Sequence, residues 1–299
     1  MTRAFRGIFP PLATPFDAAG EIQFDAFERI VAELMRRGLH GVVVAGSNGE
    51  APLLDDAERV ALIRAARVHV PADRWLIAGI AAESTRHTIA RAMAAAEAGA
   101  DVMLVASPHY FGPQMTPDAL TRHFTAVADA SPRPILLYNI PKYVHFVIPP
   151  EVVAALAAHP NVLGVKDSSG DEAQRAGYLA ALKGKGVFVT GAAHQLADAI
   201  ADGAVGGIVA VSQFATALTL KLFDAAMRGD VAGARALQEQ LAPVAREIVG
   251  GMAVPGLKAA MTMTGLPAGV PRLPLLPLGD DGRARIRTLL DGIGVAVVG

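Results

Sequence analysis

Eight short apolar runs, separated by longer Ala-rich segments, are the feature that most limits what this chain can fold into. The runs are apolar almost throughout, which is typical of parallel strands buried on both faces. The segments between them place apolar residues at helical spacing, as in 24–38 and 88–100. The runs cover residues 7–13, 41–46, 75–80, 101–107, 134–139, 162–167, 187–191 and 206–211.

This alternation predicts a closed (β/α)₈ barrel over residues 1–230, with an open doubly wound sheet as the alternative. Beyond residue 230 the strand pattern stops, and the sequence predicts a helical C-terminal extension, residues 231–299, packed on the barrel. Local signals agree with this division, because capping residues and glycines stand where helices should begin and end. The expected N-caps are Asp55, Ser84 and Thr116, and the expected helix ends are Gly38 and Gly99.

Composition excludes several classes of protein. The chain has no cysteine, which excludes disulfides, iron–sulfur clusters and a thiol nucleophile. A net charge of -1 offers no basic surface for nucleic acid or an anionic membrane. The eight histidines show no spacing typical of metal ligands, so we expect no metal site. Because neither a secretory signal nor a long apolar run is evident, we expect a cytoplasmic protein.

Lysine is rare in this chain, which favours Arg wherever a surface cation is needed. Lys166 stands near the end of the apolar run 162–167, where burial should lower its pKa. The C-terminal ends of barrel strands carry the reactive groups of such enzymes, and a neutral amine there can form a Schiff base with a ketone. An equally good interpretation, on position alone, is a structural lysine whose stem is buried and whose head pairs with Asp167 or a helix end.

Three other strand ends carry polar or aromatic side chains. Tyr138 ends the run before that of Lys166 and could shuttle protons, or it could be a core aromatic with a satisfied hydroxyl. The Gly-rich turn with Ser47 and Asn48 could present N–H groups to a carboxylate, although an ordinary tight turn is commoner. Tyr110 follows another strand and could close a pocket, meet a partner subunit or simply pack in its loop.

Four motifs, each at an expected strand end, together resemble the dihydrodipicolinate synthase / N-acetylneuraminate lyase superfamily. The resemblance covers nearly the whole chain. It implies a barrel lyase that uses no metal or organic cofactor and assembles as a homotetramer, a dimer of dimers. Its substrates would be pyruvate, or a related 2-oxo acid, and an aldehyde. The motifs are GSNGE (46–50), SPHY (107–110), YNIP (138–141) and GVKDSSGD (164–171).

The resemblance also implies a role for individual residues. Lys166 would form the Schiff base, and Tyr138 would relay protons to and from the imine and the substrate hydroxyl. The Ser47 hydroxyl would belong to that relay, and Tyr110 would complete it from across a subunit interface. The residues that it implies for binding substrate are Ser47 and Asn48, through their backbone, and Gly191 and Val209, which line the pocket.

Two departures from typical dihydrodipicolinate synthases affect the expected substrate. Asn48 stands where a threonine is usual, and Tyr143 stands where an arginine grips the carboxylate of the second substrate. A tyrosine cannot supply a bidentate cationic fork, so we include Tyr143 among the substrate-binding residues but place synthase activity second. The Ser47–Asn48 pair, AGxxxEST (78–85) and VPGLK (254–258) are most similar to 4-hydroxy-2-oxoglutarate aldolase of the eukaryotic type.

The sequence therefore predicts a Schiff-base aldolase, with 4-hydroxy-2-oxoglutarate as the best substrate hypothesis, giving pyruvate and glyoxylate. Two other enzymes stay open, namely dihydrodipicolinate synthase and a 2-oxo-3-deoxy sugar-acid aldolase or dehydratase. A non-catalytic barrel that senses a small carboxylate is the alternative from another class. Binding alone needs no nucleophile, so the presence of a lysine beside a tyrosine favours an enzyme.

Overall fold

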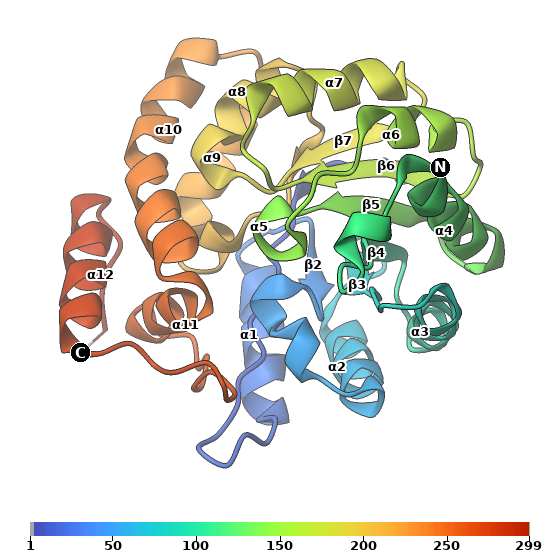
Figure 1. Cartoon of the computed structure of the whole chain (residues 1–299). Helices are drawn as coiled ribbons and strands as arrows, with labels where there is room; N and C mark the ends of the chain where they lie inside the picture. Colours follow the sequence, from blue (N-terminus) through green and yellow to red (C-terminus); the bar gives the residue numbers. More distant parts are fainter. Residues whose placement is uncertain (1–2, 299) are drawn as a thin grey trace.

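A barrel of eight parallel strands forms the centre of the molecule (Figure 1), as described for residues 3–298 by a computed structural model. The strands lie in the order β1-β8-β7-β6-β5-β4-β3-β2, and a bridge between Pro11 and Val43 joins the two ends of this order. A doubly wound sheet would reverse its strand order, so the predicted barrel is confirmed. The strands are β1 (Gly7–Ile8), β2 (Gly41–Val44), β3 (Trp75–Gly79), β4 (Val102–Ala106), β5 (Ile135–Asn139), β6 (Val162–Asp167), β7 (Val187–Thr190) and β8 (Gly206–Gly207).

Helices follow the strands and surround the barrel. The three expected N-caps each accept a hydrogen bond from the backbone N–H three residues later. Gly38 and Gly99 adopt positive φ after their helices, as expected of helix ends. The helices are α1 (Phe24–Arg36), α2 (Asp56–His69), α3 (Thr85–Glu97), α4 (Pro117–Ala130), α5 (Pro141–Val144), α6 (Pro150–Leu156), α7 (Glu172–Leu182), α8 (Leu196–Ala201), α9 (Thr216–Met227), α10 (Val231–Val244), α11 (Ala253–Met263) and α12 (Asp280–Gly292).

The first and last strands are shorter than the apolar runs predict. β1 stops at Ile8 because Pro10 and Pro11 have no N–H group to continue a ladder. β8 stops at Gly207, and the chain soon coils into a 3₁₀ turn, η5 (Ala210–Gln213). The predicted lengths of these two strands were therefore wrong, although their positions were right.

Apolar side chains fill both faces of the sheet, which explains why the runs do not alternate with polar residues. Side chains from the strands fill the interior of the barrel, which is a packed core as expected for this fold. Tyr138 belongs to this inner set, and Lys166 is paired with it in the β5–β6 register. The inner apolar residues include Phe9, Val43, Ile77, Leu104, Leu136, Val189 and Ile208.

The C-terminal helices α10 to α12 stand along one side of the barrel, coloured orange to red in Figure 1. A π-helical segment, η6 (Ala245–Gly251), joins α10 to α11, and α11 packs against the turn that follows β2. Val270 pairs with Phe16, so the extension is also hydrogen-bonded to the N-terminal part of the chain. The domain boundary at residue 230 stays a prediction. Within residues 3–298, the helices are all too short or too polar to cross a membrane.

Candidate active site

The side chain of Lys166 lies inside the barrel, near the C-terminal end of β6. Its backbone is in register with Tyr138 of β5 and Val189 of β7. Only 4% of the residue is exposed, and its Nζ lies 3.7 Å from the centroid of the Tyr138 ring. Burial lowers the pKa of Lys166, while the Tyr138 hydroxyl acts in the opposite direction. The amine is therefore easier to deprotonate than that of an exposed lysine.

Tyr138 connects this amine to the turn after β2. Its hydroxyl lies 3.4 Å from the Oγ of Ser47, within reach of a weak hydrogen bond in which either group can donate. Ser47 begins a 3₁₀ turn, η1 (Ser47–Gly49). Lys166, Tyr138 and Ser47 thus come from three separate strand ends, and Tyr138 contacts both of the others.

The turn that carries Ser47 and Asn48 is held in an unusual backbone conformation. Ala45 and Glu50, on either side of it, adopt left-handed φ angles of 54° and 59°. Such angles cost energy for residues other than glycine, and they persist where the surroundings impose them. Gly79 of β3 leaves the space that this conformation needs, because a Cβ at that position would overlap the carbonyl oxygen of Ala45. The first amides of a helical turn have no acceptor within it, so this geometry suits a carboxylate.

Gly191 and Val209 follow β7 and β8, on the side of β6 away from β5 and Tyr138. A Cβ at Gly191 would overlap the Ser168 hydroxyl and would lie 3.1 Å from Cε of Lys166, so glycine leaves space beside both side chains. Val209 follows β8, is completely buried and accepts a hydrogen bond of 2.7 Å from Ser212. Ser168 was not predicted as a site residue, although it stands two positions after Lys166 in a motif that was recognised.

The carboxylate of Asp167 does not serve as the partner of Lys166. One of its oxygens accepts a hydrogen bond of 2.7 Å from the Asn139 amide, and the other accepts one of 2.7 Å from the Ser169 hydroxyl. Asn139 in turn accepts a hydrogen bond from the backbone of Ile148. This buried network joins the ends of β5 and β6 and fixes the strand ends that carry Tyr138 and Lys166. The interpretation of a lysine held by Asp167 is not supported.

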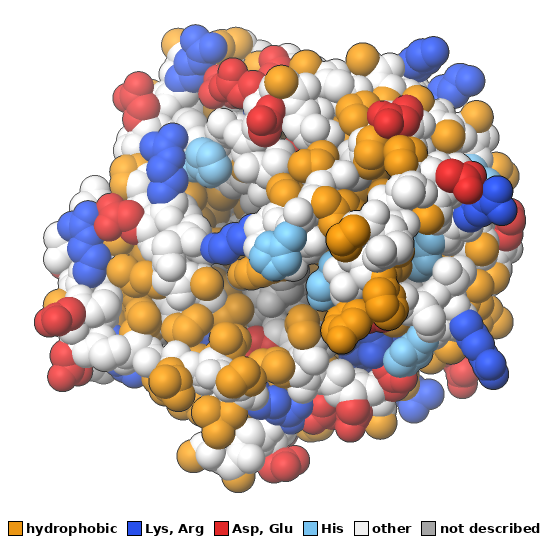
Figure 2. Space-filling model, viewed as in Figure 1, with side chains coloured by type: hydrophobic (Ala, Val, Ile, Leu, Met, Phe, Trp, Pro, Cys, Tyr) orange, Lys and Arg blue, Asp and Glu red, His pale blue; other side chains and the backbone are white. Residues whose placement is uncertain are grey.

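A cleft of about 980 Å³ opens over this end of the barrel. Ser47, Tyr138, Tyr143 and Tyr110 all line it. Tyr143 belongs to α5 and is 43% exposed, and partial burial raises the pKa of its hydroxyl. Tyr110 is 78% exposed on the rim, where its ring meets that of Phe111 edge to face. Figure 2 shows hydrophobic side chains gathered beside a hollow near the centre of this face.

Comparison with known proteins decides the family. The model of the dihydrodipicolinate synthetase family matches residues 4–293. The chain belongs to this family. Membership makes the protein a lyase and agrees with the predicted superfamily.

Relatives and solved structures extend the match over the whole barrel. The chain is 33% identical to a 4-hydroxy-tetrahydrodipicolinate synthase of Exiguobacterium, over 96% of this chain and 97% of that protein. It is 37% identical to synthase 1 of Streptomyces coelicolor, over 88% of this chain and 86% of that one. Its structure is similar to the chloride-inhibited dihydrodipicolinate synthase of Acinetobacter baumannii, complexed with pyruvate. That pair has a TM-score of 0.93 and 27% identity, with 98% of this chain and 100% of the other covered.

A second solved structure is a prophage protein of the dihydrodipicolinic acid synthase family from E. coli K12, also in complex with pyruvate. It has a TM-score of 0.92 and 29% identity, and the match covers 98% of this chain and 99% of that one. The two relatives described above carry the synthase name, whereas the sequence motifs favour 4-hydroxy-2-oxoglutarate aldolase. The family is thus shown, and the closer resemblance to the aldolase finds no support in these comparisons.

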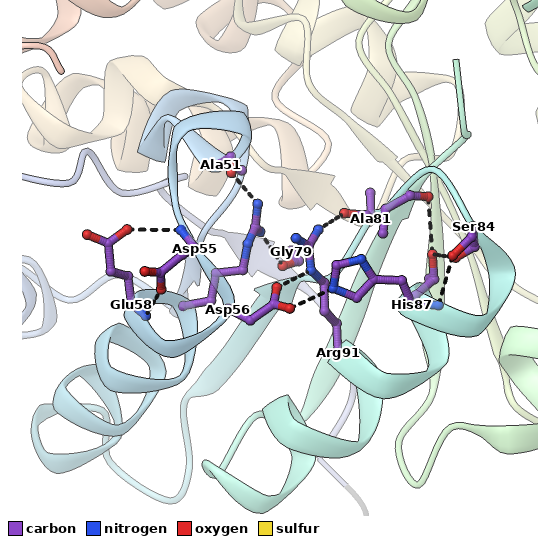
Figure 3. A network of polar contacts seen from close by, with 12 residues as sticks. Ala51, Asp55, Asp56, Glu58, Gly79, Ala81, Ser84, His87 and Arg91 are labelled. Atoms are coloured by element: carbon purple, nitrogen blue, oxygen red, sulfur yellow. Dashed lines mark hydrogen bonds and ion pairs between the residues drawn. The ribbon is translucent and has the colours of Figure 1, made fainter. Parts of the chain in front are cut away.

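A charged network between α2 and α3 lines one part of the cleft (Figure 3). Asp56 accepts hydrogen bonds of 2.6 Å from His87 and 2.7 Å from Arg91, and Arg91 also donates to the carbonyl of Ala81. Arg59 is committed to backbone carbonyls, including that of Ala51. These guanidinium groups hold the rim together. Within residues 3–298, no group of three or more His, Asp or Glu side chains is arranged to hold a metal ion.

Proposed function

We propose that this protein is a Schiff-base lyase that joins pyruvate to an aldehyde or releases pyruvate from the corresponding hydroxy acid. The observation that carries the proposal is the buried amine of Lys166 beside Tyr138, whose hydroxyl reaches Ser47. An amine with a lowered pKa is a nucleophile near neutral pH, and an adjacent phenol can move protons.

The reaction follows from this arrangement. The neutral amine of Lys166 attacks C2 of pyruvate, and the carbinolamine oxygen, protonated through Tyr138, leaves as water. The resulting imine withdraws electrons from C3, so that loss of a C3 proton gives an enamine. Enamine C3 then attacks the aldehyde carbon, whose oxygen takes a proton from the relay. Hydrolysis of the imine releases the product and restores the amine, and the reverse sequence cleaves the same C–C bond.

The remaining predicted residues have supporting roles in this proposal. The amides and side chains of the Ser47–Asn48 turn would bind the pyruvate carboxylate, because the turn faces the cleft beside Tyr138. Gly191 leaves the space that Lys166 occupies. Val209 would close the far wall of the pocket, and Tyr110 would contribute from the rim in a homotetramer.

The names of the relatives favour the synthase reaction, which reverses the order of the candidates given by the sequence motifs. The product in that name, a hydroxylated tetrahydrodipicolinate, is a seven-carbon dicarboxylate. Removing the three carbons of pyruvate leaves a four-carbon amino aldehyde with its own carboxylate, aspartate semialdehyde. Two carbons separate its carboxylate from the aldehyde carbon, and at that distance Tyr143 offers one hydroxyl in place of a guanidinium.

A second candidate, cleavage of 4-hydroxy-2-oxoglutarate, is favoured by this same Tyr143. Glyoxylate carries its carboxylate directly on the aldehyde carbon, so that this group would lie nearer Lys166 and needs no cation at position 143. The sugar-acid alternative has no observation of its own in the cleft. A carboxylate sensor would have no use for the relay of Lys166, Tyr138 and Ser47.

The test begins with pyruvate and borohydride, which reduce an imine to a stable adduct that mass spectrometry can locate. We expect the adduct on Lys166, and an absence of any adduct would overturn the Schiff-base proposal. Coupled assays with aspartate semialdehyde and glyoxylate then choose the acceptor. Tyr143→Arg provides a further test, because a new bidentate contact should raise kcat/KM for the semialdehyde by roughly tenfold. An unchanged value would show that position 143 does not reach the second carboxylate.

A further inference from the structure

A second buried lysine is joined to the turn that carries Ser47 and Asn48. Glu50 ends this turn, and its side chain is completely buried. Its Oε1 lies 2.5 Å from Nζ of Lys258, a residue of α11 with a side chain only 2% exposed. An ion pair therefore connects the C-terminal extension to the end of the turn that carries the proposed carboxylate site.

Both partners also form hydrogen bonds with the segment after α11. Lys258 donates to the carbonyl of Val270 at 2.6 Å, and the other oxygen of Glu50 accepts from the backbone N–H of Arg272 at 2.8 Å. The same segment is fastened to the N-terminal part of the chain, because the N–H of Val270 donates to the carbonyl of Phe16. Lys258 also lies 4.7 Å from the centre of the Phe16 ring. The pair is thus fixed from several directions.

Stability alone does not explain this pair. Two charges taken out of water pay a large desolvation penalty, and apolar residues of the same volume often stabilise a protein as well or better. What the pair supplies is geometry: Glu50 stands in the left-handed conformation, and its carboxylate is held at a fixed point. The neighbouring carbonyl of Gly49 accepts a hydrogen bond of 2.8 Å from Thr14, which holds the turn from the other side.

We propose that Glu50 and Lys258 are positioning residues that hold the Ser47–Asn48 turn in the shape that binds the pyruvate carboxylate. Glu50 acts on the turn through its backbone, and Lys258 acts through Glu50. The C-terminal extension is then part of the substrate site, although it supplies no group to the chemistry. This inference rests on the proposed function, because it assigns the pair to pyruvate binding.

The experiment measures imine formation as a function of pyruvate concentration, by borohydride labelling of Lys166. It needs no knowledge of the aldehyde. The test variant is Glu50→Gln with Lys258→Met, which removes both charges together and leaves neither one unpaired. The matched control is Glu247→Gln with Arg285→Met, which removes a two-point ion pair between η6 and α12 in the same extension.

We expect the test variant to need at least tenfold more pyruvate for half-maximal labelling, with the same labelling at saturation. The control should stay within twofold of the parent in both measurements. Half-maximal labelling within twofold of the parent in a folded test variant overturns the inference. If the double variant does not fold, Glu50→Gln alone is judged by the same limits. A parent protein that forms no imine fails the proposed function before any variant is compared, so the two failures are distinguishable.

Discussion

Lys166 and Lys258 are both buried, yet their neighbours differ. Their residues are 4% and 2% exposed, and burial lowers the pKa of each, that of Lys258 to about 8. Lys258 faces the carboxylate of Glu50 and a backbone carbonyl, so its charge is compensated and its hydrogens are directed at acceptors. Lys166 instead lies over the ring of Tyr138.

The difference teaches that burial alone does not identify a nucleophile. A lysine reacts with a ketone through the lone pair of its neutral form, which needs both a lowered pKa and a free approach to the nitrogen. Lys258 has the first property, but an ion pair and a carbonyl occupy its nitrogen. Lys166 is next to a residue that lines the cleft, and its nearest carboxylate, Asp167, is engaged elsewhere.

Removing Lys166 should have the largest effect and is the strongest test of this comparison. Lys166→Ala should abolish the pyruvate adduct and lower turnover by at least roughly 10³-fold, because no other amine can form the imine. Mass spectrometry of the labelled parent should place the adduct on Lys166 and leave Lys258 unmodified. A label on Lys258, or normal turnover by Lys166→Ala, would refute the assignment of roles.

Altering the neighbour of the reactive lysine should have the next largest effect. Tyr138→Phe keeps the ring over the amine but removes the hydroxyl, so we expect turnover to fall by roughly 10²-fold through loss of proton transfer. Borohydride labelling should still occur, but more slowly, as rapid-quench measurements would show. Ser47→Ala is the matched comparison at the other end of the 3.4 Å contact and should have a smaller effect. A Tyr138→Phe protein with parental rates would remove the phenol from the relay.

The sequence predicted the barrel because a strand that is buried on both faces is apolar along its whole length. This property can be recognised in each of the eight runs separately. The sequence also placed Lys166 and Tyr138 correctly at strand ends, since the ends follow from the runs. It did not predict Ser168 or the pair of Glu50 and Lys258. These contacts join positions whose spacing depends on how the whole chain closes. A signal for Lys258 existed, because it is another rare lysine in an apolar stretch.

The predicted lengths of β1 and β8 were wrong for a local reason. Apolar character continues past Ile8 and Gly207, but hydrogen bonding does not, because prolines follow the first strand and a 3₁₀ turn follows the last. The role of Tyr143 also could not be decided from sequence. The structure places it on the cleft, but its reach toward a second carboxylate depends on the bound aldehyde.

Variants of Tyr110 test whether the proton relay around Lys166 is complete within one subunit. Its exposure of 78% suits a residue that projects from its own chain toward another. We expect Tyr110→Phe to lower turnover by roughly tenfold, less than a direct acid–base group. A folded monomer should lose more turnover than stability, as sedimentation, thermal unfolding and kinetics on one preparation would show. Full activity in such a monomer would place the relay in a single subunit.

The smallest expected effect is on stability. It is the pH dependence that Lys258 contributes to the free energy of unfolding. The pKa of Lys258 is about 8 in the folded protein and has a usual value of 10.5. Between these values the unfolded chain binds a proton that the folded protein does not, so the free energy of unfolding rises with pH. The slope is at most about 1.4 kcal/mol per pH unit.

Below pH 8 both states carry the proton, and the cost of burying it is fully present. Urea unfolding of the parent and of Glu50→Gln with Lys258→Met at pH 7.5, 8.5 and 9.5 measures this contribution as a difference, because the other titrating groups are shared. The parent should gain stability relative to the variant as the pH rises. A constant difference would mean that the ion pair with Glu50 keeps Lys258 charged throughout, and the contrast with Lys166 would then be sharper still.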